Sequence, residues 1–208
     1  MSKRYSIQHH SVADWDITHG TTYSTLSNAD YISEPTSLRT QSPDGVVYDI
    51  VVCRIGTTLN LPEGEVRTWM RNVGRSYQPA VFRNQSPLGS AIRDNTYILR
   101  YIISTISLIR GVAGGWLTID SSSAPSISAD WNHFRVHWYN GKNPAEQEAL
   151  CVDTYVEVAG EWQKRGDTLY DTSNMWKDSS INRTGIQPTS GRALDPMYTD
   201  DTEICGPP

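Results

Sequence analysis

Two carboxylates, Asp153 and Glu157, fall on the same face of a predicted strand over residues 149–158, with Tyr155 between them. A stereochemistry-retaining glycosidase needs two carboxyl groups about 5.5 Å apart, one as the acid and one as the nucleophile. Four residues of an extended strand span about 13 Å, so these two carboxylates cannot form that pair. A partner carboxylate would have to come from another strand, which makes a hydrolase the least favoured function.

Histidine spacing raises the question of a metal site. His133 and His137 are four residues apart, a spacing that suits two metal ligands on a helix. On a strand the same spacing separates the two residues by about 13 Å, so they cannot share an ion. His9 and His10 point to opposite faces of an extended chain. All five histidines are therefore expected on the surface or in hydrogen bonds.

The elements that carry these residues form a predicted strand pair. "DWNHFRVHWYNG" (130–141) alternates apolar and polar side chains, which is typical of a half-buried strand. Its Asn-Gly ending favours a turn, which "KNPAEQ" lengthens before the alternating run 149–158. The two runs predict an antiparallel hairpin with one buried face. The buried face takes Phe134, Val136 and Trp138, and the other face takes Trp131, His133, Arg135, His137 and Tyr139.

Length and composition limit the class of protein. The chain has 208 residues, enough for one large all-β domain with a sizeable core. Its 18 Lys and Arg against 23 Asp and Glu give a net charge of −5, and no basic run favours nucleic acid as a partner. Polar residues interrupt the longest apolar stretch, "YILRYIISTISLI", and the N-terminus lacks an apolar leader. We therefore expect neither a membrane span nor a signal peptide.

Short strand-like segments separated by turn residues run along the whole chain, and no segment predicts a long amphipathic helix. The β-branched residues of 96–109 favour two strands or one long bent strand. Residues 160–197 are expected to form a loop that packs onto the sheets through Trp162 and Trp176. Strands are predicted near 5–8, 31–40, 46–55, 65–72, 79–84, 96–109, 115–120, 131–139, 149–158 and 198–205.

Several segments, taken in order, resemble the concanavalin A-like lectin/glucanase superfamily, particularly its laminin G-like jelly rolls. The segments are "SEPTSLRTQ" (33–41), "TYILRYIISTISLIRG" (96–111), "GGWLTI" (114–119), "DWNHFRVHWYNG" (130–141), "ALCVDTYVEVAGEW" (149–162), "NRTGI" (182–186) and "YTDDTEI" (198–204). The resemblance implies an all-β sandwich of two antiparallel sheets, one with a concave face, in which the last strand lies beside an early one. It covers a jelly-roll domain over 31–208, and 1–30 is expected to be an N-terminal arm or edge strand.

The resemblance also implies a possible calcium ion, the one cofactor that we expect. Related sandwiches often bind one ion at a sheet rim through carboxylates and backbone carbonyls. "TDDTEI" supplies Asp200 and Asp201, and "ADWDITHG" supplies Asp14 and Asp16 if the two ends of the chain meet. The alternative is that all four acids are solvated loop residues.

Three aromatic side chains of the hairpin are candidate ligand-binding residues. Trp131, Tyr139 and Tyr155 are predicted on the exposed side, where rings of this kind stack against the apolar faces of sugars. The alternative is that the segment 160–197 or a subunit interface covers them. The sequence leaves both interpretations open.

Domains of this superfamily usually act outside cells, yet the sequence shows neither a secretion signal nor a disulfide framework. A virus particle would reconcile these facts, because its proteins are made in the host cytoplasm and then exposed on the virion surface. We therefore expect a non-enzymatic structural protein of a bacteriophage, either a capsid decoration or a tail-associated protein. Its partners would be the major capsid protein and symmetric copies of itself. A carbohydrate-binding, lectin-like module is the alternative function.

Overall fold

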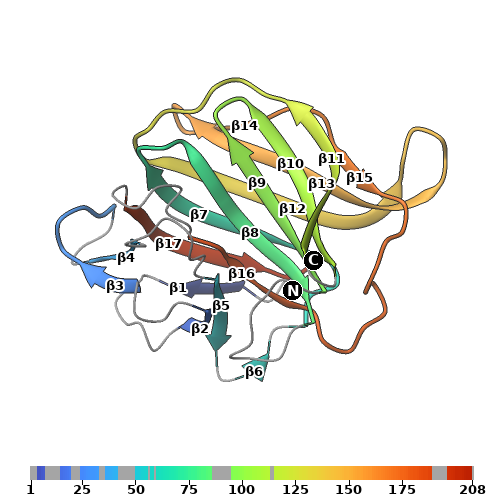
Figure 1. Cartoon of the computed structure of the whole chain (residues 1–208), viewed down its shortest axis with the longest axis horizontal. Coiled ribbons are helices and arrows are strands. Elements are labelled where there is room, and N and C mark those ends of the chain that lie inside the picture. The colour runs from blue at the N-terminus through green and yellow to red at the C-terminus, as the bar shows by residue number, and fades with distance from the viewer. Residues whose placement is uncertain are drawn as a thin grey trace.

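The computed structural model describes residues 4–7, 15–19, 24–32, 36–41, 50–55, 57–58, 60–85, 95–112, 115–188 and 196–207. All regular structure in these ranges is β-strand, and two antiparallel sheets pack face to face (Figure 1). No helix in the described ranges is long and apolar enough to cross a membrane. The expected all-β sandwich of two antiparallel sheets is confirmed.

Sheet A carries the predicted hairpin near one end. Its order is β14 (Glu161–Lys164), β13 (Glu148–Val158), β12 (Asn132–Lys142), β7 (Gly64–Asn72), β17 (Met197–Cys205), β4 (Ser37–Thr40) and β3 (Ser24–Ser27). Two further strands join it, because β1 (Arg4–Ile7) pairs with β17 and β15 (Leu169–Asp171) pairs with β13. The last strand thus lies beside early ones, as the resemblance implies.

Sheet B forms the other layer. Its order is β11 (Gly115–Ser123), β10 (Thr105–Val112), β9 (Thr96–Ile102), β8 (Ser76–Asn84), β16 (Arg183–Ile186), β5 (Ile50–Ile55) and β2 (Trp15–His19). The short β6 (Thr57–Thr58) pairs with β5. Among the described strands β11 pairs only with β10, so it lies at one end of sheet B and is largely exposed.

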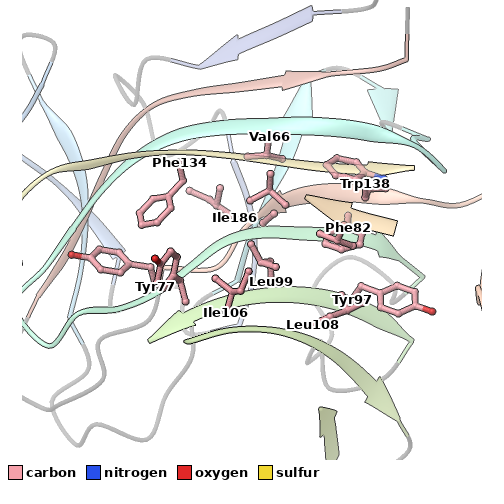
Figure 2. Packing of buried hydrophobic residues seen from close by; sticks show 14 of the residues in the cluster. Val66, Tyr77, Phe82, Tyr97, Leu99, Ile106, Leu108, Phe134, Trp138 and Ile186 are labelled. Atoms are coloured by element: carbon pink, nitrogen blue, oxygen red, sulfur yellow. The ribbon is translucent and has the colours of Figure 1, made fainter. Parts of the chain in front are cut away.

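The core lies between the two sheets and is rich in aromatic rings. Trp138 of sheet A stacks on Phe82 of sheet B with ring centroids 5.0 Å apart, and Phe134 contacts Tyr77 at 5.0 Å. Figure 2 shows these rings meeting between the layers. Because all four are fully buried, the period-two pattern of the sequence correctly identifies the inward face.

The predicted hairpin of residues 130–158 is confirmed. Strands β12 and β13 pair antiparallel, with Phe134 opposite Val156 and Trp138 opposite Val152. Residues 143–147 connect them, a longer turn than a two-residue hairpin would have. Phe134, Val136 and Trp138 are buried, whereas the alternate residues of β12 are only half-buried. The hairpin therefore presents one face to the core and one away from it.

The ambiguous region 96–109 consists of two strands. β9 and β10 pair with each other, and the chain reverses at Ile103 and Ser104, where Ile103 has a positive φ of 53°. Positive φ is unusual for a β-branched residue and here marks the tight reversal. The single long bent strand is excluded.

The N-terminal 30 residues contribute strands to both sheets. β1 lies against β17, β2 forms one end of sheet B, and β3 forms one end of sheet A. The boundary near residue 30 stays a prediction.

The described residues of the segment 160–197 form more regular structure than the loop that the sequence predicts. They contain β14, β15 and β16, and β14 and β15 extend sheet A beyond β13. Trp176 packs against the core, with its ring 5.2 Å from that of Tyr97 at an interplanar angle of 67°. The Gly, Asp and Ser content that predicts a loop fits the turns between these short strands.

A buried carboxylate ties the two sheets together. Asp171 at the end of β15 accepts hydrogen bonds from the Tyr97 hydroxyl at 2.6 Å and from Arg110 Nη1 at 2.9 Å, both in sheet B. Burial alone raises the pKa of Asp171, but hydrogen bonds from Ser173 and Tyr97, together with the Arg110 charge, lower it overall. Burial is the main reason that the pKa of Tyr97 rises to about 12.

Because its folded pKa is lowered, Asp171 stabilises the fold most above its unfolded pKa of about 3.9. We expect Asp171→Asn to lower the free energy of unfolding by about 2 kcal/mol at pH 7. The difference from the parent should shrink as the pH falls below about 4, through the folded pKa. Urea unfolding at pH 7 and pH 3 measures this. An equal difference at both pH values would contradict the assignment.

Candidate functional site

The outer face of sheet A carries three cross-strand rows of aromatic and charged side chains. They arise because the inward residues of β7, β12 and β13 fill the core, so alternate residues face outward. The rows follow the strand register. The first contains Trp162, Glu157, His133, Trp69 and Asp200, the second Lys164, Tyr155, Arg135, Arg67 and Glu203, and the third Asp153, His137, Glu65 and Cys205.

The first row centres on His133. Its ring stacks on Trp69 with centroids 4.4 Å apart and lies 4.7 Å from Trp162. Its Nδ1 is 2.6 Å from Glu157 Oε2. Burial lowers the pKa of His133, and Glu157 offsets this only in part. We therefore assign a neutral imidazole at pH 7, whose Nδ1–H donates to the carboxylate, in place of a full ion pair.

An arginine pair in the second row is bound to a carboxylate of the third row. Arg135 and Arg67 are direct cross-strand partners, and each donates its Nε–H to one oxygen of Glu65 at 2.6 Å. The guanidinium of Arg135 also lies over the ring of Tyr155, 4.9 Å from its centroid. These contacts fix the plane of the guanidinium group.

The third row continues toward the end of β12. His137 stacks on Tyr139 with centroids 4.9 Å apart, and burial lowers the pKa of His137, which keeps it neutral at pH 7. Burial and the nearby Asp153 raise the pKa of the Tyr139 hydroxyl. Asp153 itself bonds Lys164 at 2.6 Å. Burial lowers the pKa of Lys164, but the bond and charge of Asp153 raise it overall.

A cleft of about 550 Å³ opens on this face between the end of β17 and β12. Its lining includes Glu63, Glu65, Arg67, Arg135, His137 and Tyr139. Its floor depends on Gly64, because a Cβ there would meet the Cys205 backbone oxygen at 2.7 Å and a Trp138 ring carbon at 2.8 Å. The missing side chain lets β7 approach both neighbours closely.

The three predicted sugar-stacking residues all lie on the outer side of sheet A and are half-buried. They do not form one platform, because residues 131 and 139 are separated by about 27 Å of extended strand. Trp131 donates its Nε1–H to Asp30 at 2.9 Å and its ring lies 6.4 Å from that of Tyr198. Tyr139 belongs to the cleft, and Tyr155 supports the arginine pair beside it.

The predicted carboxylates are also placed apart. Asp153 bonds Lys164 and Glu157 bonds His133, each at 2.6 Å, so the two acids have separate partners. The predicted histidine pair is divided in the same way, since His133 contacts the two tryptophans and His137 contacts Tyr139. Both pairs lie on extended strands, β12 for the histidines and β13 for the carboxylates.

Of the four predicted calcium ligands, only Asp200 and Asp201 have side chains that the structure describes. Asp14 lies outside the described residues, and of Asp16 only the backbone is described, in β2 of sheet B. Asp200 is fully buried in sheet A and accepts hydrogen bonds from the Ile32 amide at 2.7 Å and the Asp201 amide at 2.9 Å. Among the described residues, no three His, Cys, Asp or Glu side chains gather as metal ligands would. A calcium site stays a prediction.

Sequence reasoning missed the contribution of β7 to the site. "GEVRTWMRN" alternates Glu65, Arg67 and Trp69 with the buried Val66, Thr68 and Met70. The alternation predicts which residues face outward, but nothing in it predicts that β7 pairs with β12. That pairing brings Arg67 opposite Arg135 and Trp69 opposite His133.

No protein-family model and no curated protein matches the sequence. Solved structures do match it. Arcelin-5, a lectin-like defence protein from Phaseolus vulgaris, has a TM-score of 0.57 at 8% identity over 98% of this chain and 97% of its own. The chain has a lectin-like β-sandwich fold. The concanavalin A-like jelly roll implied by the sequence is consistent with this likeness, which at such identity concerns the fold alone.

Two further similar structures come from carbohydrate-active proteins. An engineered GH43 glycoside hydrolase with endo-xylanase and exo-arabinofuranosidase activity has a TM-score of 0.56 at 14% identity over 97% of this chain. The chain spans only 39% of that enzyme. A carbohydrate esterase from Shiga toxin-encoding bacteriophage phi24B has a TM-score of 0.50 at 12% identity, covering 98% of this chain and 97% of its own.

Proposed function

We propose that this protein is a non-catalytic glycan-binding module whose binding surface is the outer face of sheet A. The observation that carries the proposal is the open cleft of about 550 Å³ beside half-buried aromatic rings and fixed polar groups. A sugar ring offers an apolar face and a rim of hydroxyls, and such a surface complements both.

The polar groups of the site are held in place before any ligand binds. Glu65 accepts hydrogen bonds from two arginines, and Glu63 accepts hydrogen bonds from the backbone and side-chain amides of Asn140. Tyr139 is held by its stack with His137. Groups that are already ordered lose little conformational entropy on binding, which favours recognition by an otherwise shallow surface.

The ion pairs support a binding role over catalysis. On the three rows, Glu65, Asp153 and Lys164 are in ion pairs of 2.6 Å, and Glu157 is engaged by His133. A glycosidase needs one carboxyl group that stays protonated as the acid, and a neighbouring cation opposes that state. The similar structures add support, since a lectin-like protein and carbohydrate-active enzymes share the fold.

Binding to a glycan array tests this proposal. We expect the purified protein to bind a limited set of glycans, and Tyr139→Ala to weaken that binding about tenfold by removing a cleft ring. Trp116→Ala is the control, because Trp116 is an exposed aromatic residue on the other sheet. Failure to bind any glycan, or equal binding by the Tyr139→Ala variant, would overturn the proposal.

A second candidate function is a structural role on the surface of a bacteriophage particle. The match to a phage protein over nearly the whole of both chains supports it, as does the edge strand β11, where Trp116 and Leu117 are exposed. Partners would be the major capsid protein and other copies of this chain. Light scattering of the purified chain, followed by imaging of particles, tests it. A stable monomer absent from particles would contradict this role.

A further inference from the structure

Two like charges face each other across the floor of the cleft. Arg67 of β7 and Arg135 of β12 are direct cross-strand partners, and both line the cleft. Like charges directly opposite on neighbouring strands destabilise a sheet. Departures of this kind from local stability rules are expected mainly where function requires them.

Glu65 offsets only part of this repulsion. Its carboxylate, on a residue only 8% exposed, accepts one hydrogen bond from each arginine at 2.6 Å. Glu203 lies farther away, 3.8 Å from Arg67 Nη1, and is not among the residues that line the cleft. At this end of the cleft two positive charges therefore share one close negative charge.

The arginines also keep hydrogen-bond donors available. Arg135 uses its Nε for Glu65, and within the described part of the chain its two terminal nitrogens have no hydrogen-bond partner. Tyr155 holds the guanidinium plane from one side, and the side chain is 29% exposed toward the cleft. A planar guanidinium held in this way matches the two oxygens of a carboxylate.

The other end of the cleft carries a negative charge. Glu63 is half-exposed and accepts a hydrogen bond from the Asn140 amide at 3.0 Å. The neutral His137 and the ring of Tyr139 also line the cleft. An anion would be repelled by Glu63, whereas sugar hydroxyls can donate to it. The cleft is therefore polarised along its length.

We propose that the cleft binds acidic sugars, with the ligand's carboxylate on Arg135 and Arg67 and its hydroxyls toward Glu63. The proposal rests on the glycan-binding function proposed above and names the substrate class of the same site. It gives the cross-strand arginine pair a role, since a bound carboxylate would add a negative charge on the cleft side of the pair, opposite the ion pair that Arg67 makes with Glu203.

Calorimetric titration with polygalacturonate and with its methyl-esterified form tests the proposal without changing the protein. The two polymers share a backbone and differ in the charge of the carboxyl group. We expect the acid form to bind at least about tenfold more tightly, with an affinity that falls as salt is added. Equal affinity for the two forms would contradict the acidic-sugar assignment.

Variants locate the site. Arg135→Gln and Arg67→Gln should each weaken polygalacturonate binding about tenfold or more, since each removes a charged donor. Arg71→Gln is the matched control, because Arg71 lies on β7 like Arg67 but pairs with Asp30 outside the cleft. Inorganic phosphate is the competing probe. If phosphate binds as tightly as polygalacturonate, the pair is a general anion site and the proposal fails.

The outcomes separate this inference from the function on which it rests. If the array finds only neutral glycans and Tyr139→Ala abolishes their binding, the glycan-binding function stands and the acidic-sugar inference is wrong. If neither the array nor the titration detects binding, both are wrong. Loss of binding in the Arg71→Gln control equal to that in Arg135→Gln would also overturn the assignment of the site.

Discussion

Replacing Trp138 with alanine is expected to lower the free energy of unfolding by about 3–5 kcal/mol, through lost burial and a cavity in the core. Trp138 is fully buried and stacks on Phe82 across the interface of the two sheets, as Figure 2 shows. Its Nε1–H also donates a long hydrogen bond of 3.4 Å to the Leu61 carbonyl. Because packed interiors relax only partially around a lost side chain, much of this space would stay empty.

Urea unfolding measures this effect, with Trp116→Ala as the control. Trp116 lies on the edge strand β11 and is 39% exposed, so the same substitution there should cost under about 1 kcal/mol. Trp138→Phe should recover part of the loss by keeping a ring against Phe82. Equal destabilisation by Trp138→Ala and Trp116→Ala would contradict the central packing role of Trp138 in the core.

Replacing Arg83 with methionine is expected to cost about 2–3 kcal/mol, because it removes several hydrogen bonds from one charged donor. Arg83 is fully buried, and burial lowers its pKa. Its Nε donates to the Pro62 carbonyl at 2.7 Å and its Nη2 to Asn140 Oδ1 at 2.9 Å. Its Nη1 donates to Asn174 Oδ1 at 2.6 Å. Methionine would remove these three hydrogen bonds, although Asn140 Oδ1 keeps a donor in the Asn174 side-chain amide at 3.0 Å.

Lysine at this position should fail to restore stability, because a single ammonium group cannot reach acceptors arranged around a planar fork. Arg75→Met is the matched control. Arg75 also has a positive φ, 53° against 48° for Arg83, but it is exposed. The control should change stability by less than about 0.5 kcal/mol. Thermal or urea unfolding compares the variants, and a large effect in Arg75→Met would assign the cost to backbone conformation instead.

The Arg83 network also connects the core to the cleft. Asn140, which Arg83 holds, is bound in turn by Glu63 at the cleft end. Limited proteolysis of Arg83→Met should therefore show earlier cleavage near Asn174, whose side chain loses its donor.

The sequence by itself determines the class of fold and the two faces of the hairpin. Strict alternation in "DWNHFRVHWYNG" correctly places Phe134, Val136 and Trp138 in the core and His133, Arg135 and His137 outside. Strand geometry alone also separates Asp153 from Glu157. These features are local, because the alternation of side chains and the rise per residue are properties of a single strand.

Only the tertiary structure decides which strands meet. The cleft requires β7 to lie beside β12 and β17, segments far apart in the sequence. The pairing of β7 with β12 brings Arg67 opposite Arg135 over a shared Glu65. The pairing of β14 with β13, itself beside β12, likewise brings Trp162 against His133. Many strand orders bury the same alternating apolar faces, so no local pattern selects one of them. Packing of the two sheets around Trp138 and Phe82 makes that selection, and with it the chemistry of the outer face.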